Sequence, residues 1–272
     1  MPVSADRRGV TLAETLVGLA LLGMVGGLLV RLTLAAERTT RSHEERARLH
    51  SGFDAALGYL TSEMGDLGAG DLQAVAADTL RYRATRGVGL ACAITASEVR
   101  VLASRWNATR APQPGRDSLL LSLVPDLPGA LDSGWVSAPV LGVGTGNCAG
   151  APALTLATAI DTAVSPLGGQ SPLTPVRLFE IMEARLYASA GDTWLGARSV
   201  SAGEVIQPLA GPFTPAGSRF EPRDSLQVVT PVATDARSVR VTLRGLRGQW
   251  PASAVAVPES ARMDLVPVNL LP

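Results

Sequence analysis

A long apolar run near the start of the chain is the feature that most constrains how it can fold. The run covers residues 10–30, about 21 residues, which is about 31 Å of helix at 1.5 Å per residue. That length matches the hydrocarbon thickness of a bilayer. Arg7 and Arg8 precede the run, and a single carboxylate, Glu14, interrupts it. Because a charge inside such a run is costly in lipid, Glu14 is a candidate functional residue.

Three interpretations of this segment compete. A cleaved secretory signal peptide would explain the basic start, but the apolar part is too long and no clean cleavage site precedes a domain. A plain signal anchor fits the length and places Arg7 and Arg8 on the cytoplasmic side of the membrane. It gives no reason for Glu14, where a simple anchor would carry an apolar residue. The third interpretation starts from the residues around this carboxylate.

The sequence GVTLAE at residues 9–14 resembles the class III signal of type IV prepilins. The usual form of that signal is Gly followed by Phe-Thr-Leu-Ile-Glu. Val10 and Ala13 depart from it, but both remain apolar. The resemblance implies that a prepilin peptidase cleaves between Gly9 and Val10, and that the new amino terminus of Val10 is then methylated.

The resemblance also gives Glu14 a role in assembly. Pairing of its carboxylate with the Val10 amine of a neighbouring subunit would remove much of the cost of a charge in lipid. Thr11 and Leu12 belong to the same assembly segment. The expected partners are therefore prepilin peptidase, major and minor pilins, the inner-membrane assembly platform and, before assembly, membrane lipid.

The helical pattern continues beyond the apolar run. We predict one helix over residues 10–67, with a transmembrane part at about 10–34 and an amphipathic part after it. Gly65, Gly68 and Gly70 favour its end. The sequence of residues 47–71 resembles the helix end of PilW-type minor pilins and of the J-type minor pseudopilin of type II secretion. The apolar stripe of the second part comprises Leu49, Phe53, Leu57, Leu60, Met64 and Leu67.

After the helix, short apolar runs between turn signals predict β-structure over residues 71–272. Two of them, around residues 117–126 and 235–246, also resemble strands of PilW-type proteins. The expected fold is α+β and pilin-like: a cleaved leader at 1–9, then a long N-terminal helix packed on a C-terminal antiparallel β-rich domain. The predicted strands are 79–83, 98–103, 118–124, 135–141, 153–157, 176–189, 193–200, 226–232, 238–246 and 262–270. The predicted loops are 111–115, 142–150, 165–175 and 211–222.

The composition argues against catalysis. All 24 basic residues are arginine, so a P-loop lysine and a Schiff base are excluded. Both histidines, His43 and His50, lie on the predicted helix, which leaves no Ser-His-Asp triad for the β domain. We interpret them as surface residues and expect no metal and no cofactor. The acidic pairs Glu180/Glu183 and Glu221/Asp224 are interpreted as solvated faces. We therefore expect no enzyme.

Nucleic acid is not expected as a general partner, because the net charge is zero and aromatic residues are few. The resemblance leaves contact with DNA open at a pilus tip, since pili of this family can take part in DNA uptake. We interpret the arginines of this region as ordinary surface residues. They are Arg81, Arg83, Arg86, Arg100 and Arg105.

The two cysteines, Cys92 and Cys148, are too few for a zinc site or a disulfide scaffold. In an exported domain they could form one bridge, and otherwise they would be two separate thiols.

The function that the resemblance implies is that of a minor pilin, which primes assembly of a type IV pilus and caps it. Such a protein crosses the inner membrane once and then passes into a pilus or pseudopilus in the periplasm and at the cell surface. A minor pseudopilin of type II secretion is the alternative, and a membrane-anchored extracellular binding module or enzyme is a more distant one.

Overall fold

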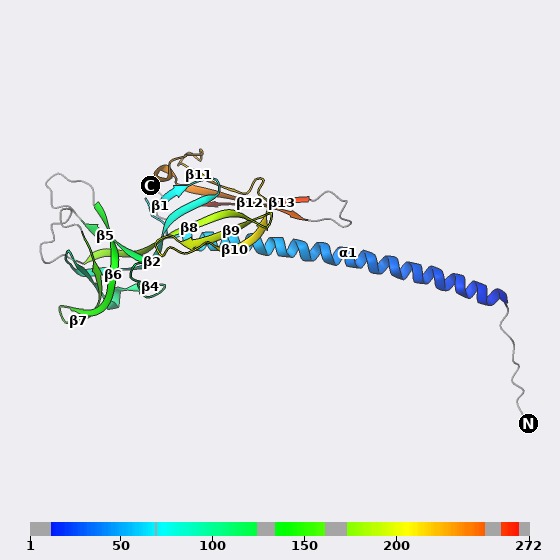
Figure 1. Ribbon diagram of the computed structural model, residues 1–272, viewed down its shortest axis with the longest axis horizontal. Helices are drawn as coiled ribbons and strands as arrows, with labels where there is room; N and C mark the ends of the chain where they lie inside the picture. Colours follow the sequence, from blue (N-terminus) through cyan, green and yellow to red (C-terminus); the bar gives the residue numbers. More distant parts are fainter. Residues whose placement is uncertain (1–11, 69, 124–133, 161–172, 248–256, 267–272) are drawn as a thin grey trace, which may run out of the picture. The chain divides into compact units, whose positions relative to one another are not determined.

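The computed structural model describes residues 12–68, 70–123, 134–160, 173–247 and 257–266 (Figure 1). It contains one long N-terminal helix followed by a large set of antiparallel strands, an α+β layout. The elements are α1 (Leu12–Met64), β1 (Leu72–Val75), β2 (Thr79–Ile94), β3 (Glu98–Leu102), η1 (Ala103–Arg105), β4 (Asn107–Ala108), β5 (Asp117–Leu123), β6 (Gly134–Cys148), β7 (Ala151–Thr158), β8 (Thr174–Ser189), β9 (Asp192–Ser199), β10 (Gln207–Phe213), β11 (Arg219–Arg223), η3 (Ala233–Asp235), β12 (Ser238–Arg247) and β13 (Val257–Leu265).

The chain divides into two compact units. One comprises Met1–His50 together with Leu246–Pro258, and the other comprises Ser51–Gly245 together with Glu259–Pro272. The last turns of α1 therefore belong to the same unit as most of the strands.

Helix α1 ends close to its predicted boundary. Its sequence is rich in Leu, Ala, Glu and Arg and contains no proline, which suits a helix of 53 residues. The N–H of Gly65 still donates to the carbonyl of Thr61 at 3.0 Å, and the next turn is closed by Leu67 on Met64. Residues 65–67, which we predicted to be helical, form this closing turn.

Six strands close into a small barrel. The antiparallel pairings run from β2 to β3, β7, β6, β5, β8 and back to β2. Its interior is filled by aliphatic side chains. The buried cluster comprises Ala91, Ile94, Val99, Val101, Leu119, Leu121, Ala138, Val140, Leu156, Ile160, Val176 and Leu178.

The long strands β2 and β8 continue beyond the barrel, where β9 and β10 extend the sheet on the β8 side. This part of the sheet packs against the end of α1. The rings of Phe53 on α1 and Phe213 on β10 stack with centroids 5.7 Å apart. The hydroxyl groups of Tyr59 and Tyr82 lie 3.4 Å apart across the same interface. The helix buries Phe53, Ala56, Leu60 and Met64, and Leu67 is buried just after it.

A separate three-stranded sheet, in the order β11-β12-β13, completes the fold. Arg240 on β12 forms a two-pronged ion pair with Asp264 on β13, at 2.6 and 2.9 Å. Thr61 near the end of α1 reaches the sulfur of Met263 at 3.2 Å.

Most of the predicted strands are confirmed, and several of them are longer in the structure. The prediction for residues 79–83 grows into β2, which runs to Ile94. The hairpin predicted from 176–189 and 193–200 is formed by β8 and β9. Ala190 and Gly191, both with positive φ, form its turn. The predicted loop 111–115 contains no strand. Residues 165–172 and 267–270 of two other predictions lie outside the described residues.

The prediction of a strand at 226–232 is wrong. The carboxylate of Asp224 accepts hydrogen bonds from the backbone N–H groups of Leu226 and Val228, and Gln227 has a positive φ of 62°. These local bonds fold the segment into a turn, because a side chain that satisfies nearby backbone groups competes with strand pairing.

Three predicted loops are also partly wrong, and in one of them, 165–175, strand β8 begins at Thr174. Strand β6 runs through most of 142–150, as far as Cys148, and β11 begins at Arg219 inside 211–222. Gly146 of β6 allows close approach of the neighbouring strand β7. A Cβ atom at Gly146 would lie 2.5 Å from the hydroxyl oxygen of Thr155.

Candidate functional site

The first half of α1 presents an apolar surface with no cover from the described part of the chain. Leu12, the first described residue of the helix, is 79% exposed, and Leu22 and Met24 are exposed to a similar degree. This is one helix that by length and composition could cross a membrane, and the most apolar 18-residue window has a mean hydropathy of 2.0. An exposed apolar surface of this extent needs lipid or another apolar partner.

The hydroxyl groups inside this half are already bonded within the helix. Thr15 donates to the carbonyl of Leu12 at 2.8 Å, and Thr33 donates to the carbonyl of Leu29 at 3.0 Å. Such bonds remove the cost of an unsatisfied hydroxyl in hydrocarbon. Between Leu12 and Val30, Glu14 is the one residue with an ionisable side chain.

Glu14 lies in the first turn of α1, as described from Leu12. A carboxylate at this end is favoured by the helix dipole. Gly18 lies four residues further on and therefore on the same face of the helix. A Cβ atom built at Gly18 would meet nothing within 4 Å. The surface next to Glu14 is thus bare backbone that a partner can approach closely.

The other predicted residues of the assembly segment are only partly visible. Gly9, Val10 and Thr11, which include the predicted cleavage site, lie outside the described residues. Leu12 and Glu14 are brought together within one helical turn.

The glycines of the apolar half serve no packing contact in the described chain. At Gly23, Gly26 and Gly27, as at Gly18, an added Cβ would meet nothing within 4 Å. Each glycine costs a helix about 1 kcal/mol relative to alanine. Packing against the described residues does not offset this cost, so the glycines indicate either close contact with another helix or a locally weak helix.

The densest charged cluster of the β domain surrounds Glu180 on β8. Its carboxylate is 1% exposed and accepts hydrogen bonds from three arginines. The distances are 2.9 Å to Arg86, 3.1 Å to Arg110 and 2.5 Å to Arg116. Arg110 also holds buried Asp117 through two bonds of 2.7 and 2.6 Å.

This cluster continues to the end of α1 and to the loop after β9. Arg86 donates to both carboxylate oxygens of Glu63 at 3.1 Å each. Arg116 reaches Glu204 at 2.7 Å. A second, smaller cluster lies on the other face of the sheet, where Glu183 accepts from Arg81 and Arg198.

These clusters correct two of our expectations. Glu180 and Glu183 are buried and paired, whereas we predicted that they form a solvated face. Arg86, predicted to be an ordinary surface arginine, has a side chain that is only 15% exposed. The signal for their burial was the position of both carboxylates within the long apolar strand β8.

Hydrogen bonds and ion pairs keep the carboxylate of Glu180 ionised and the guanidinium of Arg86 protonated. Burial alone would raise the pKa of Glu180, but hydrogen bonds from Ser199, Arg86 and Arg110 outweigh it and lower the pKa. Burial would likewise lower the pKa of Arg86, yet its bonds to Glu63 and Glu180 raise it above the ordinary value. A carboxylate held ionised by three arginines is a poor general acid or base at neutral pH.

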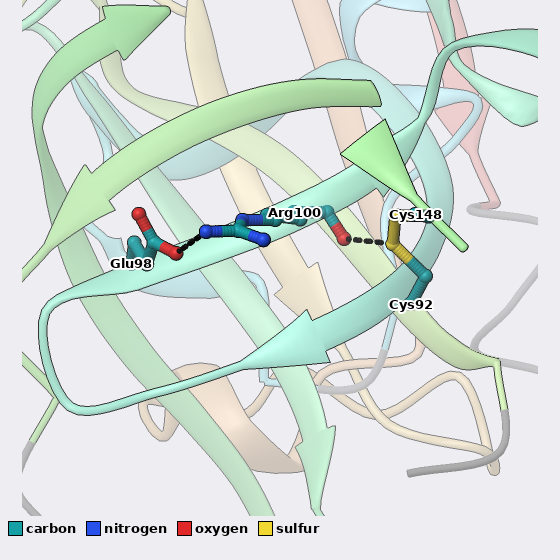
Figure 2. The surroundings of a disulfide bond; sticks show 4 residues. All are labelled: Cys92, Glu98, Arg100 and Cys148. Atoms are coloured by element: carbon teal, nitrogen blue, oxygen red, sulfur yellow. Dashed lines mark hydrogen bonds and ion pairs between the residues drawn. A yellow bond between two sulfur atoms is a disulfide. The ribbon is translucent and has the colours of Figure 1, made fainter. Parts of the chain in front are cut away.

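Cys92 and Cys148 form a disulfide between the ends of β2 and β6, with Cα atoms 6.1 Å apart (Figure 2). The Sγ atom of Cys92 lies 3.3 Å from the carbonyl oxygen of Arg100 on β3. The guanidinium of Arg100 pairs with Glu98 of the same strand at 2.6 Å. The bridge therefore connects the turn end of the β6–β7 hairpin to β2.

Within the described ranges, no group of three His, Cys, Asp or Glu side chains is placed to hold a metal ion. His43 and His50 are exposed on α1. Compared with known proteins, the chain matches no family model, no curated protein and no solved structure.

Proposed function

We propose that this chain is a minor pilin of the PilW type, which helps to start a type IV pilus and caps it. The observation that carries the proposal is the first half of α1: an exposed apolar helix with one carboxylate, Glu14, near its start. The sequence GVTLAE around that carboxylate resembles a prepilin signal. The same helix continues without a break into a segment packed on a disulfide-bonded β domain.

In the proposed mechanism the helix has two successive environments. The chain first crosses the inner membrane once, with Arg7 and Arg8 on the cytoplasmic side. Prepilin peptidase removes residues 1–9, and Glu14 then pairs with the Val10 amine of a neighbouring pilin. The exposed leucines leave lipid for a bundle of similar helices, so their apolar surface stays covered throughout. The β domain remains in the periplasm or reaches the cell surface.

The pseudopilin of a type II secretion system remains the alternative, because it would use the same helix and the same processing. Neighbouring genes distinguish the two. Pilin-like reading frames beside a secretion ATPase, without a retraction ATPase, would favour secretion.

The decisive experiment is mass spectrometry of the chain purified from cells that contain a prepilin peptidase. We expect an N-methylated amino terminus at Val10. An intact Met1, or a cut near Ala36, would contradict the proposal and favour a plain anchor or a secretory signal.

The role of Glu14 is tested separately with Glu14→Ala, and with Thr39→Ala on the same helix as the matched control. We expect Glu14→Ala to be processed normally but to be lost from sheared pili by at least tenfold. Thr39→Ala should be incorporated like the wild type. Normal incorporation of Glu14→Ala would rule out the pairing role.

A further inference from the structure

The apolar contacts at the end of α1 do not by themselves define one position of the helix. The buried residues Phe53, Ala56, Leu60 and Met64 recur every three or four residues. Hydrophobic attraction has no direction. A shift by one turn, about 5.4 Å, would place Leu60 where Ala56 lies and Met64 where Leu60 lies. Every side chain in these places would still be apolar.

Arg86 on β2 provides a contact that such a shift would destroy. Its two terminal nitrogens donate to the two carboxylate oxygens of Glu63 on α1, and its Nε donates to Glu180 on β8. All three guanidinium nitrogens are thus bonded between one helix and one strand. This two-pronged geometry fixes direction as well as distance.

Glu63 is the one acidic residue in the last two turns of α1. After a shift by one turn, Tyr59 or Leu67 would face Arg86 in its place. Neither carries a carboxylate, so two donors of a mostly buried arginine would lose their acceptor. Arg86 would then keep Glu180 as its acidic partner, and loss of one partner from a buried charge pair is destabilising.

We propose that Arg86, held between Glu63 and Glu180, sets the register of α1 on the β domain. The apolar stripe supplies the attraction, and the charged contact selects one position among those that the stripe allows. A single polar contact can specify register in this way at a cost in stability.

The test separates register from stability with the full chain in detergent micelles. In the double variant Glu63→Leu/Arg86→Leu both charged partners become apolar, while Glu180 keeps Arg110 and Arg116. The readout is the NMR spectrum of methionine methyl groups, because Met64 is buried on α1 and Met182 is buried on β8. We expect a second Met64 signal with at least a tenth of the total intensity, with Met182 still in a folded environment.

Glu63→Gln tests the same point if the double variant does not fold, and Asp54→Asn is the control. Asp54 lies exposed on the same helix, away from the cluster. A single Met64 signal at the wild-type position in a folded Glu63→Leu/Arg86→Leu or Glu63→Gln variant would overturn the proposal. So would an equal splitting of the Met64 signal in Asp54→Asn.

Discussion

Three arginines surround Glu180 on β8, where the barrel meets the part of the sheet that packs against the end of α1. The carboxylate of Glu180 stabilises the fold because it compensates the positive charges of these arginines. Without it, each arginine would be a partly buried charge with fewer partners. We expect Glu180→Gln to lower the free energy of unfolding by about 3–5 kcal/mol. Urea unfolding followed by circular dichroism measures this change.

Glu204→Gln is the matched control for Glu180→Gln. Glu204 pairs with Arg116, a member of the same cluster, but its side chain is 40% exposed. Ion pairs at such positions contribute about 0–1 kcal/mol. Equal losses in the two variants would show that burial of Glu180 has no special weight.

The same substitution, Gly→Ala, can be compared at a crowded and at an open position of the barrel strands. A Cβ atom at Gly89 would lie 2.7 Å from both the Trp106 ring and a methyl group of Val101, whereas one at Gly144 would meet nothing within 4 Å. We expect Gly89→Ala to destabilise the protein by about 1–3 kcal/mol through overpacking. Gly144→Ala should be neutral or stabilise it by about 0.4–1 kcal/mol. A lower melting temperature for Gly144→Ala than for Gly89→Ala would contradict this account.

The residues of the buried clusters could not be assigned from sequence alone. Strand β8 is buried on both faces, so its apolar and charged residues do not alternate cleanly. Without alternation, Glu180 and Glu183 carry no sign of which face they occupy. Their arginine partners come from segments up to 102 residues away, and no local pattern reveals such pairs.

The elements that could be predicted from the sequence are those that depend on residues close together in the chain. The long helix follows from its apolar run and its stripe, and the β8–β9 hairpin follows from two apolar strands around a glycine turn. Closure of the barrel was not predicted, because it depends on the pairing of β2 with β8. The turn after β11 was missed because the bonds of Asp224 outweigh the β-propensity of the valines that follow it.

The bridge between β2 and β6 gives a prediction for reducing conditions. Cys92 and Cys148 are separated by 56 positions in the sequence. Closing a loop of that length stabilises a fold by about 4 kcal/mol in the chain-entropy model. We therefore expect a reductant to lower the denaturant midpoint of the wild type. The variant Cys92→Ala/Cys148→Ala should already have the lower midpoint and should not respond to reductant.

For the molecule as a whole, the paired carboxylates predict loss of stability in acid. Hydrogen bonds and nearby arginines hold the pKa of Glu180, Glu183 and Asp264 below their ordinary values. A lowered folded-state pKa contributes stability above the unfolded value of about 4. That contribution is lost as the pH falls through the folded-state pKa. We expect nearly constant stability from pH 7 to pH 5 and a steep decline below about pH 4.

Urea unfolding at pH 7, 5, 4 and 3 checks this dependence. A variant without the larger cluster's central carboxylate, Glu180→Gln, should show a shallower decline, because one titrating group has been removed. Equal stability of the wild type at pH 7 and pH 3 would contradict the prediction.

The pairing of β2 with β8 also sets the order of events while the chain is made. Arg81 and its partner Glu183 are 102 residues apart. At about 5–20 residues per second, synthesis of that interval takes about 5–20 s. Throughout that time β2 lacks the strand that covers most of its length, and the barrel cannot close. The nascent chain therefore has to be protected from wrong pairings until β8 has emerged, and the barrel closes only after its sixth strand has been made.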